Sequence, residues 1–219
     1  MVLELKTVVS NDVGGLMSKL IDLGREVVDR KLAVGSGGNL SFRVPDSDNF
    51  YITGTGTRLD KLEPSSFALV NLEGETLSDG VAPSSEFRVH LESYKVRPDS
   101  LVCVHLHPQA SVLAASLDIE IKFLTIDHVY YVRKVVRIPW IRSGTQEIAD
   151  ATALAVEDAN IVILENHGCV VLASSVELAL ARVLNLEEAA ELTLRCEQLG
   201  ISPTEVPDAY WQHLQKSGL

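Results

Sequence analysis

The sequence has few cysteines and fewer basic than acidic side chains, and each scarcity excludes a class of protein. Its three cysteines, Cys103, Cys169 and Cys196, are odd in number, far apart and set among apolar residues. We therefore expect buried free thiols in a reducing compartment and no disulfide framework. Lys and Arg total 19 against 30 Asp and Glu, a net charge of −11, which argues against broad binding to nucleic acids or anionic membranes. An anionic substrate would then need a local positive site.

Long apolar runs are also missing. No segment approaches the roughly 20 apolar residues that span a bilayer, so we predict no membrane association. The first residues lack a basic region followed by a long apolar region, so we predict no secretory signal and a cytoplasmic location. Without repeats or an interdomain linker, 219 residues predict one domain over 1–219, with a C-terminal tail from about residue 200.

What the sequence does contain is a mixture of short apolar runs and amphipathic segments, which predicts an α/β fold with several covering helices. The expected helices run from caps at Ser10 and Asn11 to about Arg30, over 83–96, over 109–116, over 145–158, and from a Ser174–Glu177 capping box to about Leu199. Strands are expected over 40–44, 51–53, 67–72, 101–107, 161–164 and 169–173, and 119–140 is expected to be extended.

The strand LVCVHLHP, 101–108, carries His105 and His107. Residues two apart on a strand point to the same face, so these imidazoles supply half of a candidate metal site. A catalytic zinc takes three protein ligands and keeps an open position. His167 is the best third ligand because it lies in a tight turn between two apolar strands. Three neutral imidazoles would leave the full charge of the metal in place, which makes it a strong Lewis acid and a local positive site.

The remaining histidines are weaker candidates for ligands. His128 and His213 have no comparable setting, and His90 lies on an expected helix, where it suits a supporting role beside the ligands.

Two glycine-rich loops, 34–39 and 53–57, and the helix start at 83–86 can present backbone N–H groups to an anion. Each also has an ordinary interpretation. The loops are compatible with simple turns, and Ser84, Ser85 and Glu86 are compatible with a capping serine and a glutamate matched to the helix dipole. The residues alone leave both interpretations open.

Taken together, five motifs resemble those of the class II aldolase/epimerase family, which includes L-fuculose-1-phosphate aldolase, L-ribulose-5-phosphate 4-epimerase and related decarboxylases. They occur in the family order over about residues 12–200: GGNLS (37–41), TGTG (53–56), SSE (84–86), HLH (105–107) and NHG (166–168).

The resemblance implies a three-layer αβα sandwich with a central, mostly antiparallel sheet, and a homotetramer with active sites between subunits. It implies one divalent metal ion per chain, with zinc preferred over manganese or cobalt, held by His105, His107 and His167. Glu86 would be the catalytic acid/base for a metal-stabilised enediolate. The residues implied to hold a substrate phosphate are Gly38, Asn39, Thr55, Gly56, Ser84 and Ser85.

The implied reaction is aldol cleavage of a small ketose phosphate. The family's aldolases of the fuculose type place a tyrosine from the neighbouring subunit where the epimerase has an aspartate. Tyr130 aligns there and favours the aldolase, although Asp127 and His128 lie close enough to compete. Tyr210 is the candidate for a second tyrosine, from the C-terminal tail.

Other functions stay open at this point. The basic residues Arg133, Lys134 and Arg137 suit a solvated strand edge, or the carboxylate of a substrate for a decarboxylase of a sugar-acid phosphate or an aromatic acid. The scaffold also accommodates a sugar-phosphate 4-epimerase or a non-catalytic binding domain. The joint presence of Glu86 and three histidines disfavours the last of these.

Overall fold

The structure, a computed structural model, describes residues 13–216. Seven strands form one sheet in the order β3-β2-β1-β4-β7-β6-β5. Every neighbouring pair is antiparallel except β5 with β6. The strands are β1 (Asn39–Arg43), β2 (Asn49–Thr53), β3 (Phe67–Asn71), β4 (Val102–Leu106), β5 (Val135–Ile138), β6 (Ile161–Leu164) and β7 (Gly168–Ala173).

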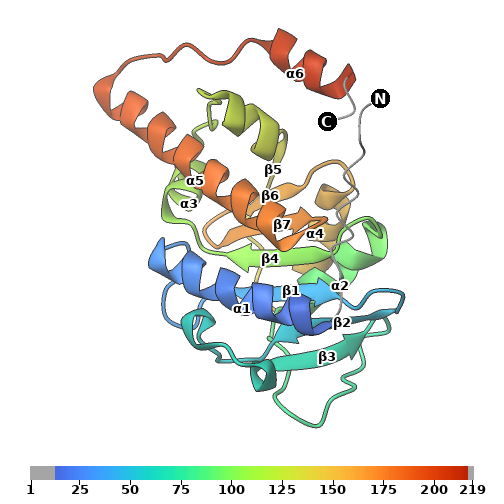
Figure 1. Cartoon of the computed structure of the whole chain (residues 1–219). Helices are drawn as coiled ribbons and strands as arrows, with labels where there is room; N and C mark the ends of the chain where they lie inside the picture. Colours follow the sequence, from blue (N-terminus) through green and yellow to red (C-terminus); the bar gives the residue numbers. More distant parts are fainter. Residues whose placement is uncertain (1–12, 217–219) are drawn as a thin grey trace.

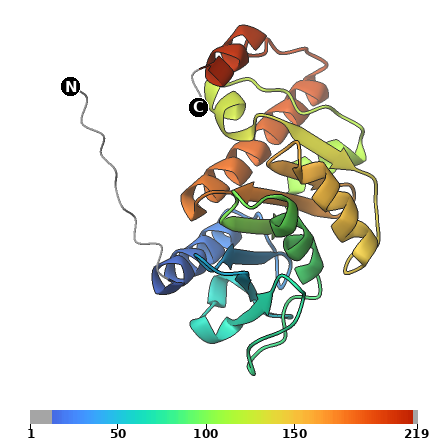
Figure 2. The same cartoon turned by 90° about the vertical axis from the view of Figure 1, so that its right-hand side faces the viewer.

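Helices cover both faces of this sheet (Figures 1 and 2). They are α1 (Val13–Asp29), α2 (Phe87–Val96), α3 (Gln109–Ser116), α4 (Gln146–Val156), α5 (Val176–Leu199) and α6 (Asp208–Lys216). Two 3₁₀ turns, η1 (Leu59–Lys61) and η2 (Pro64–Ser66), and one π turn, η3 (His128–Val132), complete the elements. Among residues 13–216, no helix is both long and apolar enough to cross a bilayer.

Alternation along the central strands produces two apolar layers. Val104 and Val171 face α1 and α5 on one side, whereas Cys103 and Leu172 face α2 and α4 on the other. Burying both faces of a sheet against helices gives the three-layer αβα sandwich. The expected fold class is therefore confirmed.

Three local expectations were wrong or lie beyond the described residues. Helix α2 begins at Phe87, after the two serines, because Gly54 bridges to Pro83 and the Ser84 N–H donates to the Thr53 carbonyl, which keeps this segment extended. The N-cap of α5 is Ser175, so Ser174 and Glu177 form no capping box. The caps expected at Ser10 and Asn11 lie outside the described residues.

The segment 119–140 is extended only in part. Residues 128–132 form the π turn η3, although they are rich in β-branched and aromatic side chains. His128 is fully buried, accepts a hydrogen bond from the Leu124 N–H and lies 3.1 Å from a carboxylate oxygen of Glu188 on α5. This tertiary contact overrides the local strand preference.

Candidate active site

The site begins at the end of the central strand β4. His105 lies within the strand and His107 directly after it, and their Nε2 atoms are 3.1 Å apart. Strand β7 pairs with β4, with Leu106 opposite Cys169. This pairing carries the β6–β7 turn, and with it His167, to the same end of the sheet.

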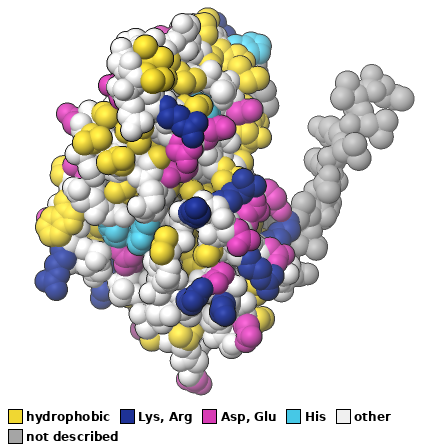
Figure 3. Space-filling view, turned by 90° about the vertical axis from the view of Figure 1, so that its left-hand side faces the viewer, with side chains coloured by type: hydrophobic (Ala, Val, Ile, Leu, Met, Phe, Trp, Pro, Cys, Tyr) yellow, Lys and Arg dark blue, Asp and Glu magenta, His cyan; other side chains and the backbone are white. Residues whose placement is uncertain are grey.

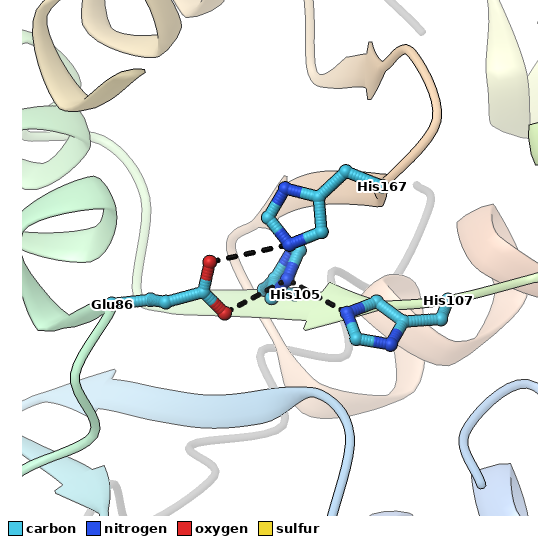
Figure 4. A group of neighbouring side chains, drawn as sticks. All are labelled: Glu86, His105, His107 and His167. Atoms are coloured by element: carbon cyan, nitrogen blue, oxygen red, sulfur yellow. Dashed lines mark hydrogen bonds and ion pairs between the residues drawn. The ribbon is translucent and has the colours of Figure 1, made fainter. Parts of the chain in front are cut away.

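Glu86 reaches this point from the other side of the strand end. It occupies the N-cap position of α2, but its side chain caps nothing. Its two carboxylate oxygens instead lie 3.2 Å from Nε2 of His105 and 3.2 Å from Nε2 of His167. All four side chains point toward one another (Figure 4), and one ligand atom from each lies within 4.8 Å of the others.

A glycine permits this close approach. A Cβ at Gly168 would lie 2.3 Å from the Leu106 carbonyl oxygen and 2.6 Å from Cδ2 of His107. Only a residue without a side chain fits between the β6–β7 turn and the end of β4. The sequence Asn-His-Gly therefore has a steric cause as well as a chemical one.

The donor set fits a divalent metal ion. Nδ1–H of His105 donates to the Cys169 carbonyl at 3.0 Å, which leaves the lone pair on Nε2 directed into the cluster. Oε1 of Glu86 is buried and accepts no hydrogen bond from the residues described. Imidazole lone pairs and a carboxylate oxygen that converge without enough protons between them are the arrangement that a cation satisfies.

The charges at the site follow from burial and contact. Burial alone would raise the pKa of Glu86, but the imidazoles of His105 and His167, each 3.2 Å from one of its oxygens, outweigh burial and hold that pKa well below its ordinary range. Burial, reinforced by His105 and His167, lowers the pKa of His107 to about 4. At neutral pH the site therefore holds a carboxylate and an imidazole at His107 that is free to act as a ligand.

The predicted anion-binding segments lie side by side next to this cluster. The loop after β2 meets the segment before α2 through the Gly54–Pro83 bridge and a hydrogen bond from the Thr55 N–H to the Ala82 carbonyl. Thr55, Gly56 and Ser85 are exposed, whereas Ser84 is buried. Gly38 and Gly56 both have positive φ, 82° and 73°, which glycine adopts most readily.

Asn39 connects these segments to Glu86. It is the first residue of β1, and its amide Nδ2 donates to Glu86 at 3.3 Å while its Oδ1 faces Nε2 of His90. His90 contacts Asn39 and Ser41 and none of the three candidate ligands, so a supporting role for it stays a prediction. Ser41 and Tyr94 continue the same hydrogen-bonded chain, and no local sequence pattern indicated a role for either side chain.

The two predicted catalytic tyrosines lie elsewhere in the chain. Tyr130 is in η3, and its ring contacts the ring of Tyr131 and the guanidinium group of Arg133. Tyr210 is on α6, which packs against η3. No contact among residues 13–216 connects either tyrosine to the four-residue cluster. His128 is committed to Glu188 inside the chain, so it is not available to a neighbouring subunit.

The cysteines take no part in the cluster. Cys103 and Cys169 are buried free thiols, as expected, and burial raises the pKa of each, which disfavours a thiolate ligand. Cys196 is also free but only partly buried. On one face of the molecule, histidine side chains reach the surface with an acidic side chain beside them (Figure 3).

Comparison with known proteins relates this geometry to a family. Residues 18–194 match the class II aldolase and adducin N-terminal domain. An L-fuculose phosphate aldolase of Methanocaldococcus jannaschii is 35% identical over 80% of this chain and 94% of its own length. A 3-oxo-tetronate 4-phosphate decarboxylase of Haemophilus influenzae is 33% identical over 86% of this chain and 93% of its own length. A solved structure of L-fuculose 1-phosphate aldolase has a TM-score of 0.84 and 25% identity, covering 93% of this chain and 95% of that one.

Proposed function

We propose that this chain, which belongs to the class II aldolase and adducin family, is a metal-dependent carbon–carbon lyase, an aldolase that cleaves a small ketose phosphate. The observation that carries this proposal is the convergence of Glu86 with His105, His107 and His167 at one strand end. An aldolase of this type needs an electrophile and a proton carrier at the same carbon–carbon bond, and this cluster contains the groups for both.

The three histidines would hold one divalent metal ion, for which we propose zinc before manganese or cobalt because imidazole nitrogen suits zinc. Bound there, the ion supplies Lewis-acid stabilisation of the negative charge that develops on substrate oxygen as the bond breaks. The contact from His105 to the Cys169 carbonyl holds that imidazole in the tautomer that presents Nε2.

Glu86 would accept and return the proton. Because its pKa is held below the ordinary range, it is ionised at neutral pH and therefore acts first as a base. Its position at the start of α2 places both carboxylate oxygens at the cluster, and the partial burial of the side chain limits competition from water.

The phosphate would bind beside this acid, at the two loops and the segment before α2. Gly38 and Gly56 offer backbone N–H groups, and Thr55, Ser84, Ser85 and Asn39 add side-chain donors. Support comes from their proximity: the loop after β2 bonds to the segment that leads into Glu86, and Asn39 bonds to Glu86 itself.

We further propose that four chains assemble with active sites at their interfaces, that the domain spans 1–219 with the tail as its C-terminal arm, and that the enzyme acts in the cytoplasm. Tyr130 and Tyr210 would then act on a neighbour's site. Their separation from the cluster within one chain is what such an arrangement requires.

Decarboxylation of a sugar-acid phosphate is the second candidate, because the Haemophilus influenzae relative carries that activity in its name. The basic residues that favoured it have partners within the chain, however. Arg137 pairs with Asp118 and Glu165, and Lys134 lies 3.6 Å from Asp158. These contacts match a solvated strand edge better than a carboxylate site.

The test is a screen of C4–C6 ketose phosphates and keto-acid phosphates with added divalent ions, in which aldehyde and CO2 are measured separately. We expect aldehyde release from a ketose phosphate, abolished by a chelator and restored by zinc. Release of CO2 alone would replace the aldolase with the decarboxylase.

A further inference from the structure

A chain of buried hydrogen bonds leads from Glu86 into the core between α2 and the sheet. Asn39 Nδ2 contacts Oε2 of Glu86 at 3.3 Å, and Asn39 Oδ1 contacts Nε2 of His90. Nδ1 of His90 contacts Ser41 Oγ at 2.6 Å, and Ser41 Oγ contacts the Tyr94 hydroxyl at 2.8 Å. Beyond Glu86, each of these side chains is at most 3% exposed.

The negative charge on Glu86 fixes the direction of every bond in this chain. A carboxylate accepts only, so the Asn39 amide must turn its NH₂ toward Glu86 and its oxygen toward His90. The His90 Nε2 must then carry the proton, and its Nδ1 accepts from the Ser41 hydroxyl. Ser41 in turn accepts from Tyr94. With the amide reversed, its oxygen would face the carboxylate, and the two would repel.

The geometry arises from two regular spacings. Glu86, His90 and Tyr94 are four residues apart along the start and body of α2 and so share one face of the helix. Asn39 and Ser41 are two apart on β1 and share one face of the strand. Two faces of this kind, packed together, interleave their side chains into a single row.

Burying a row of polar side chains in the core costs desolvation free energy, so the row calls for a functional explanation. Burying an amide, an imidazole and two hydroxyls is unfavourable where apolar residues would pack equally well, yet in this row each side chain has a hydrogen-bond partner and Glu86 accepts at its end. We infer that Asn39 and His90 are positioning residues for the catalytic glutamate: they fix the Asn39 amide so that it holds the Glu86 carboxylate against the histidine cluster. This inference rests on the proposed role of Glu86 as the acid/base. Asn39 keeps a second amide hydrogen, so a phosphate contact is compatible with this role.

Two substitutions of His90 by amides separate positioning from packing. In His90→Gln the longer side chain carries its amide close to the position of Nε2, where it donates to Asn39. In His90→Asn the amide ends near the position of Nδ1 and Asn39 loses its donor. We expect kcat to fall about tenfold to a hundredfold in His90→Asn, and His90→Gln to recover most of it. KM and the bound metal should be the same in both variants.

Two further variants make the outcomes distinguishable. Ser93→Ala removes another buried hydroxyl from α2, one that bonds only to the Val89 carbonyl, and should leave kcat unchanged. Glu86→Gln should abolish turnover while keeping the metal. Activity in Glu86→Gln would overturn the proposed function. An inactive Glu86→Gln together with equal kcat in the two His90 variants would overturn the positioning role alone.

The tautomer of His90 gives a readout that needs neither turnover nor a variant. Long-range ¹H–¹⁵N spectra of the wild-type imidazoles should show His90 neutral with the proton on Nε2. A proton on Nδ1 would mean that the hydrogen bonds of the row have the opposite direction, and the inference would fail.

Discussion

Gly168 controls how closely the β6–β7 turn approaches the end of β4. Replacing it with alanine would place a methyl group 2.3 Å from the Leu106 carbonyl oxygen, so the turn must move and take His167 with it. We expect Gly168→Ala to lower the free energy of unfolding by about 1–3 kcal/mol and to weaken metal binding. Urea denaturation and equilibrium dialysis measure the two effects.

The matched control is Gly80→Ala, because a Cβ at Gly80 meets no other atom within 4 Å. It should leave both quantities unchanged. If Gly168→Ala bound metal as tightly as this control, the turn would not be what positions His167.

His90 predicts a dependence of stability on pH. Burial lowers its pKa from 6.5 to about 3 in the folded chain, so below pH 6.5 the unfolded chain takes up a proton that the folded chain refuses. The contribution to stability is complete above that pH and is lost as the pH falls toward 3, at about 1.4 kcal/mol per unit. Urea midpoints of wild type and His90→Gln at pH 7 and pH 5 should therefore differ more in wild type. Equal pH dependence would show that His90 is already charged or open to water.

For individual residues, the sequence was informative where the chemistry of a site requires a particular residue type. It was less informative where packing between elements determines the partners of a side chain. The convergence of His105, His107 and His167 could be predicted because few residue types bind a metal ion, whereas Glu86 was added by the family resemblance. The partners of Asn39 could not be predicted, since its place opposite His90 depends on the packing of α2 against β1, which no local pattern specifies.

Helix α5 is the longest element and its start tests the assignment of its cap. The Ser175 side chain accepts a hydrogen bond from the Leu178 N–H. We expect Ser175→Ala to cost about 1 kcal/mol of unfolding free energy, and Ser174→Ala almost nothing, as measured by urea denaturation. The reverse order would restore the capping box that the sequence pattern suggested.

Elements with clear local boundaries were predicted closely, such as α3 over 109–116, which follows Pro108, and β6 over 161–164, which is apolar throughout. Prediction failed where a long-range bond overrides local preference. The bridge from Gly54 to Pro83 keeps the chain extended there, so α2 begins later than predicted. The contact of His128 with Glu188 favours the π turn η3 over a strand.

For the whole molecule, the layered fold was predictable because the central strands are apolar on both faces, whereas contacts between chains leave no periodic pattern in a sequence.

The position of Tyr130, away from the cluster of its own chain, makes the proposed assembly testable. If Tyr130 acts on a neighbour's site, Glu86→Gln and Tyr130→Phe chains should complement each other.

We expect chains of the two variants, co-expressed in equal amounts, to form hybrid tetramers with about a quarter of the sites intact, although each variant alone has little or no activity. The measurement is the aldol cleavage rate of the co-expressed protein against that of the separately purified variants mixed afterwards. Hybrids no more active than that mixture would place Tyr130 outside the neighbour's site.

If the three histidines form a metal centre, each chain binds a defined number of divalent ions, and that number can be measured. Equilibrium dialysis against zinc should give about one ion per chain for wild type and for His213→Ala, whose histidine lies on α6, but almost none for His107→Ala or His167→Ala. A wild-type chain that binds no divalent ion, or that binds it equally well without His107 or His167, would contradict this account.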